Sequence, residues 1–435
     1  MKTVGFATLG CRLNQVESQE MRGLVEKAGY RAVEEGEAAE IYVVNTCTVT
    51  SRADFSDRQA IRRIARGSPN ALVVVTGCLA QTDPDALARM PGVDLVIGNQ
   101  EKYRLPELLA SLGKRDRPEV LVERITDARD VPSAPVTRMS GRSRAFVKIQ
   151  DGCQHRCAFC IVPAARGRSR SQEPAVLVEQ VEALVGAGYG EITLTGVDIG
   201  HYGWDLSPRT SLAALLGRLA GIEGLRWLRL SSVLPAYFTP ELVRAVTTTP
   251  TVAPHLHLPL QSGSDRVLRL MRRPYNTAMY RALAERLAAA IPDLGLGADV
   301  IVGHPGESDA DFEATLALVG DLPLSYLHVF AYSDRKGTEA AKMGDRVPSA
   351  VIRERSARLR ALGVEKSAAF RRRLLGRAVE VVVLEGRQAE GALAGLTSNF
   401  VEVTFAGPEG LGRRFATVRI TEADRRGARG VLEAA

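Results

Sequence analysis

Six cysteines in two groups of three restrict the fold of this 435-residue chain more than any other feature. Cys153, Cys157 and Cys160 form a CxxxCxxC loop that directly follows an apolar segment, Ala145–Gln150. Three thiols at this spacing cannot all pair with one another, so a disulfide framework does not explain them. They can instead bind three irons of a [4Fe–4S] cluster and leave the fourth iron open for a ligand.

Zinc is the alternative metal for this loop, because soft thiolates also suit zinc. A structural zinc site takes four protein ligands, however, and only three cysteines are present in the loop. His155 is the nearest candidate for the fourth ligand, and its place inside the loop favours the cluster over zinc.

The other three cysteines, Cys11, Cys47 and Cys78, each come directly after a predicted strand. Because the carboxyl ends of parallel strands meet at one edge of a sheet, helical connections of similar length should bring these thiols together. Cysteine is also a common small buried residue, which is the plainer explanation for any one of the three. All of the cysteines in this part of the chain follow strands, and that favours a second three-thiolate site.

Strand and helix patterns alternate over residues 1–112, and a polar linker that contains Pro and Ser follows at residues 113–142. Alternation of this kind predicts an α/β fold with a doubly wound parallel sheet. The predicted strands are Thr3–Leu9, Ile41–Asn45, Ala71–Thr76 and Val93–Ile97, with one more at Val120–Val122 inside the linker.

The alternation resumes over residues 143–369, where six strands and the helices between them predict a partial (β/α)6 TIM-like barrel. The site of such a barrel lies at the carboxyl ends of its strands. The predicted strands are Ala145–Gln150, Glu191–Thr195, Arg226–Ser231, His255–Pro259, Gly297–Val302 and Tyr326–Tyr332.

Residues 370–435 have short Val-rich strands and no helix between them, which predicts a small all-β barrel of the OB type. The predicted strands are Ala378–Leu384, Asn399–Phe405 and Phe415–Ile420.

Charge and hydropathy limit the partners. The net charge of +7 comes from 57 Lys and Arg against 50 Asp and Glu, and it is compatible with an anionic partner without requiring one. The sequence has no apolar run of the ~18–20 residues that span a bilayer. Its first ten residues resemble a strand more than a signal peptide, so we expect a cytoplasmic protein whose thiols stay reduced.

The CxxxCxxC loop at the mouth of a partial barrel resembles the radical S-adenosylmethionine (SAM) superfamily. The resemblance implies that SAM chelates the open iron, and that an electron from the cluster cleaves it to a 5′-deoxyadenosyl radical. The cofactor would supply the difficult chemistry and the protein would position it.

Two groups of three cysteines followed by a small β-barrel resemble the methylthiotransferase family over nearly the whole chain. The resemblance implies an N-terminal methylthiotransferase domain, a radical SAM barrel and a C-terminal TRAM domain. It rests on the segments LGCRLNQVES, NTCTVT, TGCLAQ, DGCQHRCAFCIVPAARGRSRS, HLPLQSGSDRVLRLMRR, DVIVGHPGES and AYSDRKGT.

Membership of this family would mean replacement of an unactivated C–H by S–CH3, with two [4Fe–4S] clusters and two SAM molecules per turnover. One SAM would donate a methyl group to sulfur at the auxiliary cluster on Cys11, Cys47 and Cys78. The second would be cleaved at the cluster on Cys153, Cys157 and Cys160, and its radical would remove the substrate hydrogen. An electron donor such as flavodoxin or ferredoxin would reduce the cluster.

Five residues at predicted strand ends match family segments and are candidates for SAM contact. The alternative is a plain strand-to-loop turn for the glycine and satisfied polar groups at the barrel mouth for the others. The candidates are Gly196, Asp198, Ser231, Gln261 and Asp299.

Two clusters of arginine are candidates for RNA contact through phosphates. Arg166, Arg168 and Arg170 follow the CxxxCxxC loop, and a solvated Arg-rich surface explains them equally well. Arg413 and Arg414 lie on the predicted β-barrel, a kind of fold that commonly presents nucleic-acid surfaces.

The family divides into branches that differ in substrate. Two modify an adenosine 3′ of the tRNA anticodon that carries either an N6-threonylcarbamoyl or an N6-isopentenyl group, and a third modifies a ribosomal-protein aspartate. The segment GCRLNQ resembles the threonylcarbamoyl branch. In this chain, Arg12 and Leu13 stand at the positions after Cys11 where the other two branches favour different residue pairs. The expected partner is therefore the tRNA anticodon stem-loop, with neither DNA nor membrane involved. A non-catalytic Fe–S RNA-binding regulator is the alternative of another class.

Overall fold

The computed structural model describes the whole chain except residues 35, 115–116, 135, 137, 387–390 and 434–435. Parts of the predicted linker therefore lie outside the described residues. The chain forms two compact units. Unit 1 consists of residues 1–138, 148–172 and 333–341, and unit 2 of residues 139–147, 173–332 and 342–435. The CxxxCxxC loop thus belongs to the same unit as the N-terminal sheet.

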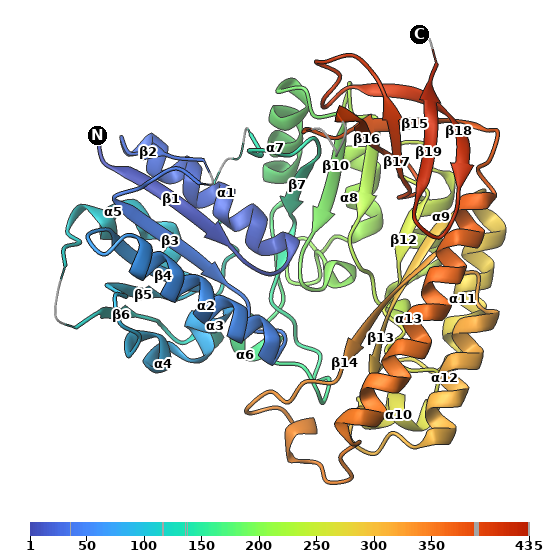
Figure 1. Cartoon of the computed structure of the whole chain (residues 1–435), viewed down its shortest axis with the longest axis horizontal. Helices are drawn as coiled ribbons and strands as arrows, with labels where there is room; N and C mark the ends of the chain where they lie inside the picture. The colour runs from blue at the N-terminus through green and yellow to red at the C-terminus, as the bar shows by residue number, and fades with distance from the viewer. Residues whose placement is uncertain (35, 115–116, 135, 137, 387–390, 434–435) are drawn as a thin grey trace. The chain divides into compact units, whose positions relative to one another are not determined.

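Unit 1 is built on a six-stranded sheet of order β2-β1-β3-β4-β5-β6, in which every pair is parallel (Figure 1). The predicted doubly wound sheet is confirmed, and the two-residue strand β2 is an addition to it. The strands are β1 (Thr3–Thr8), β2 (Arg31–Ala32), β3 (Ile41–Thr46), β4 (Leu72–Gly77), β5 (Leu95–Ile97) and β6 (Glu119–Leu121).

Both faces of this sheet are covered because its central strands are apolar on both sides, as parallel strands usually are. Helices α1 and α5 pack on the face that presents Val43 and Val74. Helices α2, α3 and α4 pack on the face that presents Val44 and Val75. The helices are α1 (Arg12–Lys27), α2 (Ser51–Gly67), α3 (Cys78–Thr82), α4 (Pro84–Ala88) and α5 (Leu105–Ala110), with 3-10 turns η1 (Glu101–Arg104) and η2 (Ile125–Asp127).

Residues 148–172 of unit 1 carry the CxxxCxxC loop. The loop is flanked by β8 (Gln150–Asp151) and β9 (Arg170–Ser171), which pair in antiparallel fashion. The short helix α6 (Val162–Arg166) lies between the loop and β9 and packs against α3.

Unit 2 contains the predicted partial barrel as two three-stranded sheets, β11-β10-β7 and β12-β13-β14. Parallel bridges from Leu228 to Val252 and from Ser232 to His257 join the two sheets through β11 and β12. The strands are β7 (Ala145–Lys148), β10 (Glu191–Thr195), β11 (Trp227–Leu230), β12 (His255–His257), β13 (Gly295–Val302) and β14 (Tyr326–Ala331).

Helices lie between successive barrel strands, and α13 packs along β14 and against α12 (Figure 1). The helices are α7 (Pro174–Gly186), α8 (Leu212–Leu219), α9 (Pro240–Thr248), α10 (Asp265–Leu270), α11 (Thr277–Ala290), α12 (Asp309–Asp321) and α13 (Ser349–Arg372). The 3-10 turns of unit 2 are η3 (Ile199–His201) and η4 (Pro235–Tyr237), while η5 (Ala340–Lys342) lies mostly in unit 1.

The C-terminal strands of unit 2 close into a five-stranded barrel of order β15-β16-β17-β19-β18, which confirms the predicted small β-barrel. Its core is formed by Val381, Val403, Phe405 and Val418 among others. A second cluster joins Trp227 and Ala253 to Val382 and Leu396. The strands are β15 (Ala378–Val383), β16 (Leu393–Thr397), β17 (Glu402–Ala406), β18 (Phe415–Ala423) and β19 (Ala428–Leu432).

None of the helices in the described parts of the chain combines the length and the apolar character needed to cross a membrane.

Candidate metal centre and its surroundings

Cys11, Cys47 and Cys78 lie at the carboxyl ends of three adjacent strands, β1, β3 and β4. Cys11 is the residue before α1, and Cys78 is the first residue of α3. The thiols are close enough to interact: burial raises the pKa of Cys47 to about 12, and the neighbouring thiols of Cys78 and Cys11 contribute to that rise. A metal that binds here must displace these protons, and it would relieve the mutual repulsion of the thiolates.

Two glycines allow the strand ends to come this close. Gly10 and Gly77 have φ angles of +98° and +97°, in the left-handed region where other residues are strained. A Cβ on Gly10 would lie 2.9 Å from the sulfur of Cys47, and one on Gly77 would overlap the backbone of Thr46. The backbone at both positions is therefore packed against the cysteine-bearing strands.

Cys153, Cys157 and Cys160 are half-buried in the loop between β8 and α6. The loop is held at its start by a hydrogen bond from the Cys153 amide to the Gly167 carbonyl, at 3.0 Å, and at its end by one from Cys160 to Cys157, at 3.1 Å. The amide of His155 donates to the sulfur of Cys153 at 3.4 Å. Amide donors of this kind stabilise thiolate sulfur.

A structural zinc ion takes four protein ligands at short distances, and each cysteine group offers three thiols. Tetrahedral zinc, with Zn–S bonds of about 2.3 Å, places its thiolate sulfurs about 3.8 Å apart. Among the described residues, the one group of three potential ligands whose donor atoms all lie within 4.8 Å consists of His257, Asp299 and His328, in unit 2. Each cysteine group offers three thiols, which is the ligand set of a [4Fe–4S] cluster with one open iron.

Arg166 and Arg170, which were predicted to contact RNA, are only 2% and 3% exposed. Arg166 donates to Glu17 and Asp151, and Arg170 lies 3.7 Å from Asp151. Buried guanidinium groups that are paired with protein carboxylates do not fit a contact with RNA phosphates. The intervening Arg168 is exposed, as is Arg414, while Arg413 is half-buried and stacks over Tyr189 with 4.3 Å from guanidinium carbon to ring centre.

The residues predicted to contact SAM follow strands of unit 2. Ser231 comes directly after β11, and its hydroxyl oxygen is buried without a hydrogen bond. Gln261 has a φ of +68° and a buried Oε1 that also lacks a hydrogen bond. Asp198 accepts a hydrogen bond from Tyr237 at 3.1 Å, and Gly196 directly follows β10. Unsatisfied buried polar atoms are uncommon, and the oxygens of Ser231 and Gln261 are able to accept hydrogen bonds.

Asp299 on β13 lies between two imidazoles, with its Oδ1 3.2 Å from Nε2 of His257 and 3.2 Å from Nδ1 of His328. Burial alone would raise the pKa of Asp299, but these two imidazoles hold it well below its usual value. Sequence reasoning missed His328. Its signal is the alternation of Tyr326 and His328 on β14, beside Gly297 and Asp299 on β13.

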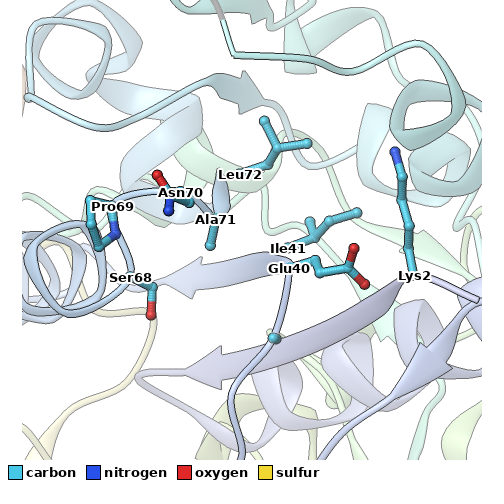
Figure 2. A pocket seen from close by; sticks show the side chains of 9 residues that line it. Lys2, Glu40, Ile41, Ser68, Pro69, Asn70, Ala71 and Leu72 are labelled. Carbon is cyan, nitrogen blue, oxygen red and sulfur yellow. The ribbon is translucent and has the colours of Figure 1, made fainter.

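Unit 1 also contains a pocket of about 490 Å³ (Figure 2). It is lined by Lys2, Glu40 and the segment Ser68–Leu72, at the amino ends of β1, β3 and β4. Ligands of parallel sheets bind at the carboxyl ends, where the cysteines lie. We therefore assign no part of the chemistry to this pocket.

The chain has the two domains expected of a radical SAM enzyme with an additional N-terminal domain. Residues 147–319 match the model of the radical SAM superfamily, and residues 3–98 match a family described only as uncharacterized protein family UPF0004. Among solved structures, the radical SAM methyltransferase TsrM from Kitasatospora setae has the same fold, with a TM-score of 0.57 and 16% identity over 78% of this chain and 76% of that one.

Relatives that match over nearly their full length define the family. A threonylcarbamoyladenosine tRNA methylthiotransferase of Bacillus subtilis is 38% identical over 97% of this chain and 94% of its own, and one of Aquifex aeolicus is 37% identical over 94% and 98%. A tRNA-2-methylthio-N(6)-dimethylallyladenosine synthase of Frankia alni is 40% identical over 94% and 83%. The chain belongs to the family of radical SAM tRNA methylthiotransferases.

Proposed function

We propose that this chain is an enzyme that replaces C2–H of N6-threonylcarbamoyladenosine, 3′ of the tRNA anticodon, with a methylthio group. The observation that carries the proposal is the presence of two separate groups of three thiols in one compact unit. Attack on an unactivated C–H bond needs a radical source, and delivery of sulfur needs a second site.

Each group of residues has a role in this reaction. The two cysteine groups would each hold one [4Fe–4S] cluster through three thiolates. When bound, the cluster on Cys153, Cys157 and Cys160 would supply, with SAM, the radical that removes the substrate hydrogen. The cluster on Cys11, Cys47 and Cys78 would be the place at which sulfur, from the cluster or from added sulfide, is methylated and transferred. In unit 2, the unpartnered oxygens of Ser231 and Gln261, together with Gly196, Asp198 and Asp299, would bind and orient SAM.

The substrate branch rests on the sequence around the first cysteine. Relatives named for threonylcarbamoyladenosine and for dimethylallyladenosine are about equally identical to this chain, so identity does not separate them. The segment GCRLNQ, with Arg12 and Leu13 after Cys11, favours the threonylcarbamoyl substrate. Dimethylallyl-modified adenosine, which is the isopentenyl substrate, is the second candidate because so many similar relatives carry that name.

The proposed partners follow from the same chemistry. The exposed Arg168 and Arg414, together with Arg413, are candidates for contact with phosphates of the anticodon stem-loop. A flavodoxin or ferredoxin would supply electrons in the cytoplasm.

Mass spectrometry of tRNA nucleosides tests the proposal. The reconstituted protein is incubated anaerobically with SAM, dithionite, sulfide and a tRNA pool that carries both modified adenosines. We expect the methylthio group on threonylcarbamoyladenosine alone. A product on isopentenyladenosine would overturn the substrate and leave the reaction standing.

Two cysteine variants separate the enzyme from a regulator. A Cys47→Ala variant should still release 5′-deoxyadenosine from SAM and form no methylthio product. A Cys157→Ala variant should do neither. A protein that carries both clusters and releases no 5′-deoxyadenosine would be the non-catalytic RNA-binding regulator.

A further inference from the structure

Arg166, at the end of α6, is the centre of a buried ionic network in unit 1. Its Nη1 and Nη2 donate to the two carboxylate oxygens of Glu17 at 2.8 Å and 3.1 Å. The same two nitrogens donate to Asp151 Oδ1 at 3.1 Å and to Asn14 Oδ1 at 2.8 Å. All four side chains are buried. One guanidinium therefore connects three elements of the unit: α1, β8 and α6.

On one side, Arg166 reaches the loops that bear Cys11 and Cys47 through Asn14. The Nδ2 of Asn14 donates to the Leu9 carbonyl at 2.8 Å and to the Thr46 carbonyl at 2.9 Å. Leu9 lies two residues before Cys11, and Thr46 directly precedes Cys47. Because Arg166 occupies Oδ1 of Asn14, it fixes the amide so that Nδ2 faces these carbonyls.

On the other side, Arg166 reaches the CxxxCxxC loop. Asp151 Oδ1 accepts both from Arg166 and from the amide of Gly152, at 2.8 Å, directly before Cys153. Gly167, the residue after Arg166, accepts a hydrogen bond at its carbonyl from the Cys153 amide, at 3.0 Å. The side chain of Arg166 and the backbone beside it thus hold the start of this loop.

Charge around the network also favours bound thiolates. Arg166 ends α6 and Cys78 begins α3, and these two short helices pack against each other. Lys102 lies 2.7 Å from Glu17 and is fully buried with it. A cation held beside a buried thiolate offsets part of the free energy that burial of the negative charge costs.

We propose that Arg166 is a positioning residue shared by the two cysteine groups, which sets the geometry for cluster binding at both through Asn14 and Asp151. The proposal rests on the assignment of both groups to clusters and is independent of the nucleoside that is modified. A buried ion pair is weak evidence for stability, since its desolvation often outweighs its attraction, so a role in stability alone does not account for this network.

The test uses four variants of the full chain: Arg166→Gln, Arg166→Lys, Asn14→Ala and Asp151→Asn. Each is placed in two backgrounds, one with Cys153, Cys157 and Cys160 replaced by Ala and the other with Cys11, Cys47 and Cys78 replaced by Ala, so that each cluster is measured alone. The readouts are iron and sulfide bound after reconstitution, the EPR spectrum, and the midpoint potential of each cluster. Arg22→Gln is the control, because Arg22 is also paired with two carboxylates in unit 1, Glu26 and Glu34.

We expect Arg166→Gln to weaken iron binding at both sites, by roughly 10–100-fold as for other residues that orient metal ligands. Asn14→Ala should weaken iron binding only at the site of Cys11, Cys47 and Cys78. Asp151→Asn should weaken it only at the site of Cys153, Cys157 and Cys160. Arg166→Lys retains the positive charge but lacks the planar, two-pronged guanidinium. Compared with Arg166→Gln, it should return the midpoint potential of the cluster on Cys11, Cys47 and Cys78 to that of the unsubstituted chain and recover only part of the iron binding.

Three results would overturn the proposal. One is an Arg166→Gln variant that binds normal clusters at both sites. Another is an Arg166→Gln variant that loses iron binding at one site only. The third is an equal loss in Arg22→Gln, which would make the effect one of general stability. If Arg166→Gln does not fold, Arg166→Lys, Asn14→Ala and Asp151→Asn decide the question through the same readouts. Failure of the unsubstituted Cys11, Cys47 and Cys78 site to bind iron would instead refute the proposed function.

Discussion

Gly10 lies so close to Cys47 that a Cβ built on Gly10 would be 2.5 Å from the Cβ of Cys47. The φ of Gly10 is +98°, so a side chain there would be strained as well as crowded. The contact joins the end of β1 to the end of β3, the two strands that precede Cys11 and Cys47. A residue other than glycine at position 10 would therefore push these two cysteines apart.

Replacement of Gly10 by Ala should abolish iron binding by Cys11, Cys47 and Cys78. Iron content and EPR in the background without the other cysteine group measure this directly. Gly29→Ala is the matched control, because Gly29 has a φ of +87° with no atom within 4 Å of a built Cβ. Both variants should lose about 1–3 kcal/mol from backbone strain, and only Gly10→Ala should lose the metal. Equal iron content in the two variants would contradict the prediction.

Removal of Arg229 should destabilise unit 2. Arg229 and Glu191 are both fully buried, with 2.6 Å between Nε and Oε1, and Arg229 also donates to the Ser398 carbonyl at 2.7 Å. Among the described residues, Arg229→Met leaves Arg144 as the single cation paired with the carboxylate of Glu191. The free energy of unfolding should therefore fall by about 3 kcal/mol.

Tryptophan fluorescence during urea unfolding measures this loss, because both tryptophans of the chain, Trp204 and Trp227, belong to unit 2. The double variant Arg229→Met/Glu191→Leu should recover most of the lost free energy, since it leaves no unpaired charge at this position. A double variant as unstable as the single one would show that the bond to Ser398 matters more than the ion pair.

Strand positions and cysteine positions could be predicted from the sequence because both depend on local patterns. An apolar, β-branched run of the right length defines β3 or β4 without reference to the rest of the chain, and Cys47 and Cys78 follow directly. Strands β16 and β19 were missed because Leu393–Thr397 and Ala428–Leu432 contain glycine and carry few β-branched residues. Their pairing is determined by closure of the barrel, which is a long-range property.

The orientation of the arginines after the CxxxCxxC loop could not be predicted. Arg166, Arg168 and Arg170 have the same chemistry and even spacing, yet the first and third are buried and the second is exposed. What separates them is the set of carboxylates that the tertiary structure brings to them: Glu17 from α1 and Asp151 from β8. Glu17 is 149 residues away from Arg166 in sequence, and no local pattern encodes that pairing.

Replacement of Asp299 by Asn should weaken SAM binding. The neighbouring imidazoles of His257 and His328 keep the pKa of Asp299 low, so the carboxylate is charged at neutral pH and is a stronger acceptor for hydroxyl groups than an amide. Loss of one hydrogen bond to a charged group should raise the dissociation constant for SAM about tenfold, as measured by equilibrium dialysis of the reconstituted protein without reductant. Asp321→Asn, on the exposed surface of α12, is the control. An unchanged dissociation constant for SAM in Asp299→Asn would show that the carboxylate of Asp299 contacts only the two imidazoles and not SAM.

The effect of Asp311→Asn on stability should depend on pH. Burial alone would raise the pKa of Asp311, but bonds from Arg266, Ser264 and Ser308 outweigh burial and bring it below the ordinary value of 3.8. A carboxylate with a lower pKa in the folded state stabilises the protein above its unfolded pKa and loses that contribution as pH falls. The urea midpoint of Asp311→Asn should therefore lie below that of the unsubstituted chain at pH 7. The difference should begin to shrink near pH 4, at about the unfolded pKa, and should keep shrinking as pH falls further towards the folded pKa. A difference that stays constant over this range would mean that the amide preserves the electrostatic contribution, and that the loss comes from the altered start of α12, where Asp311 bonds the Ser308 amide at 2.9 Å.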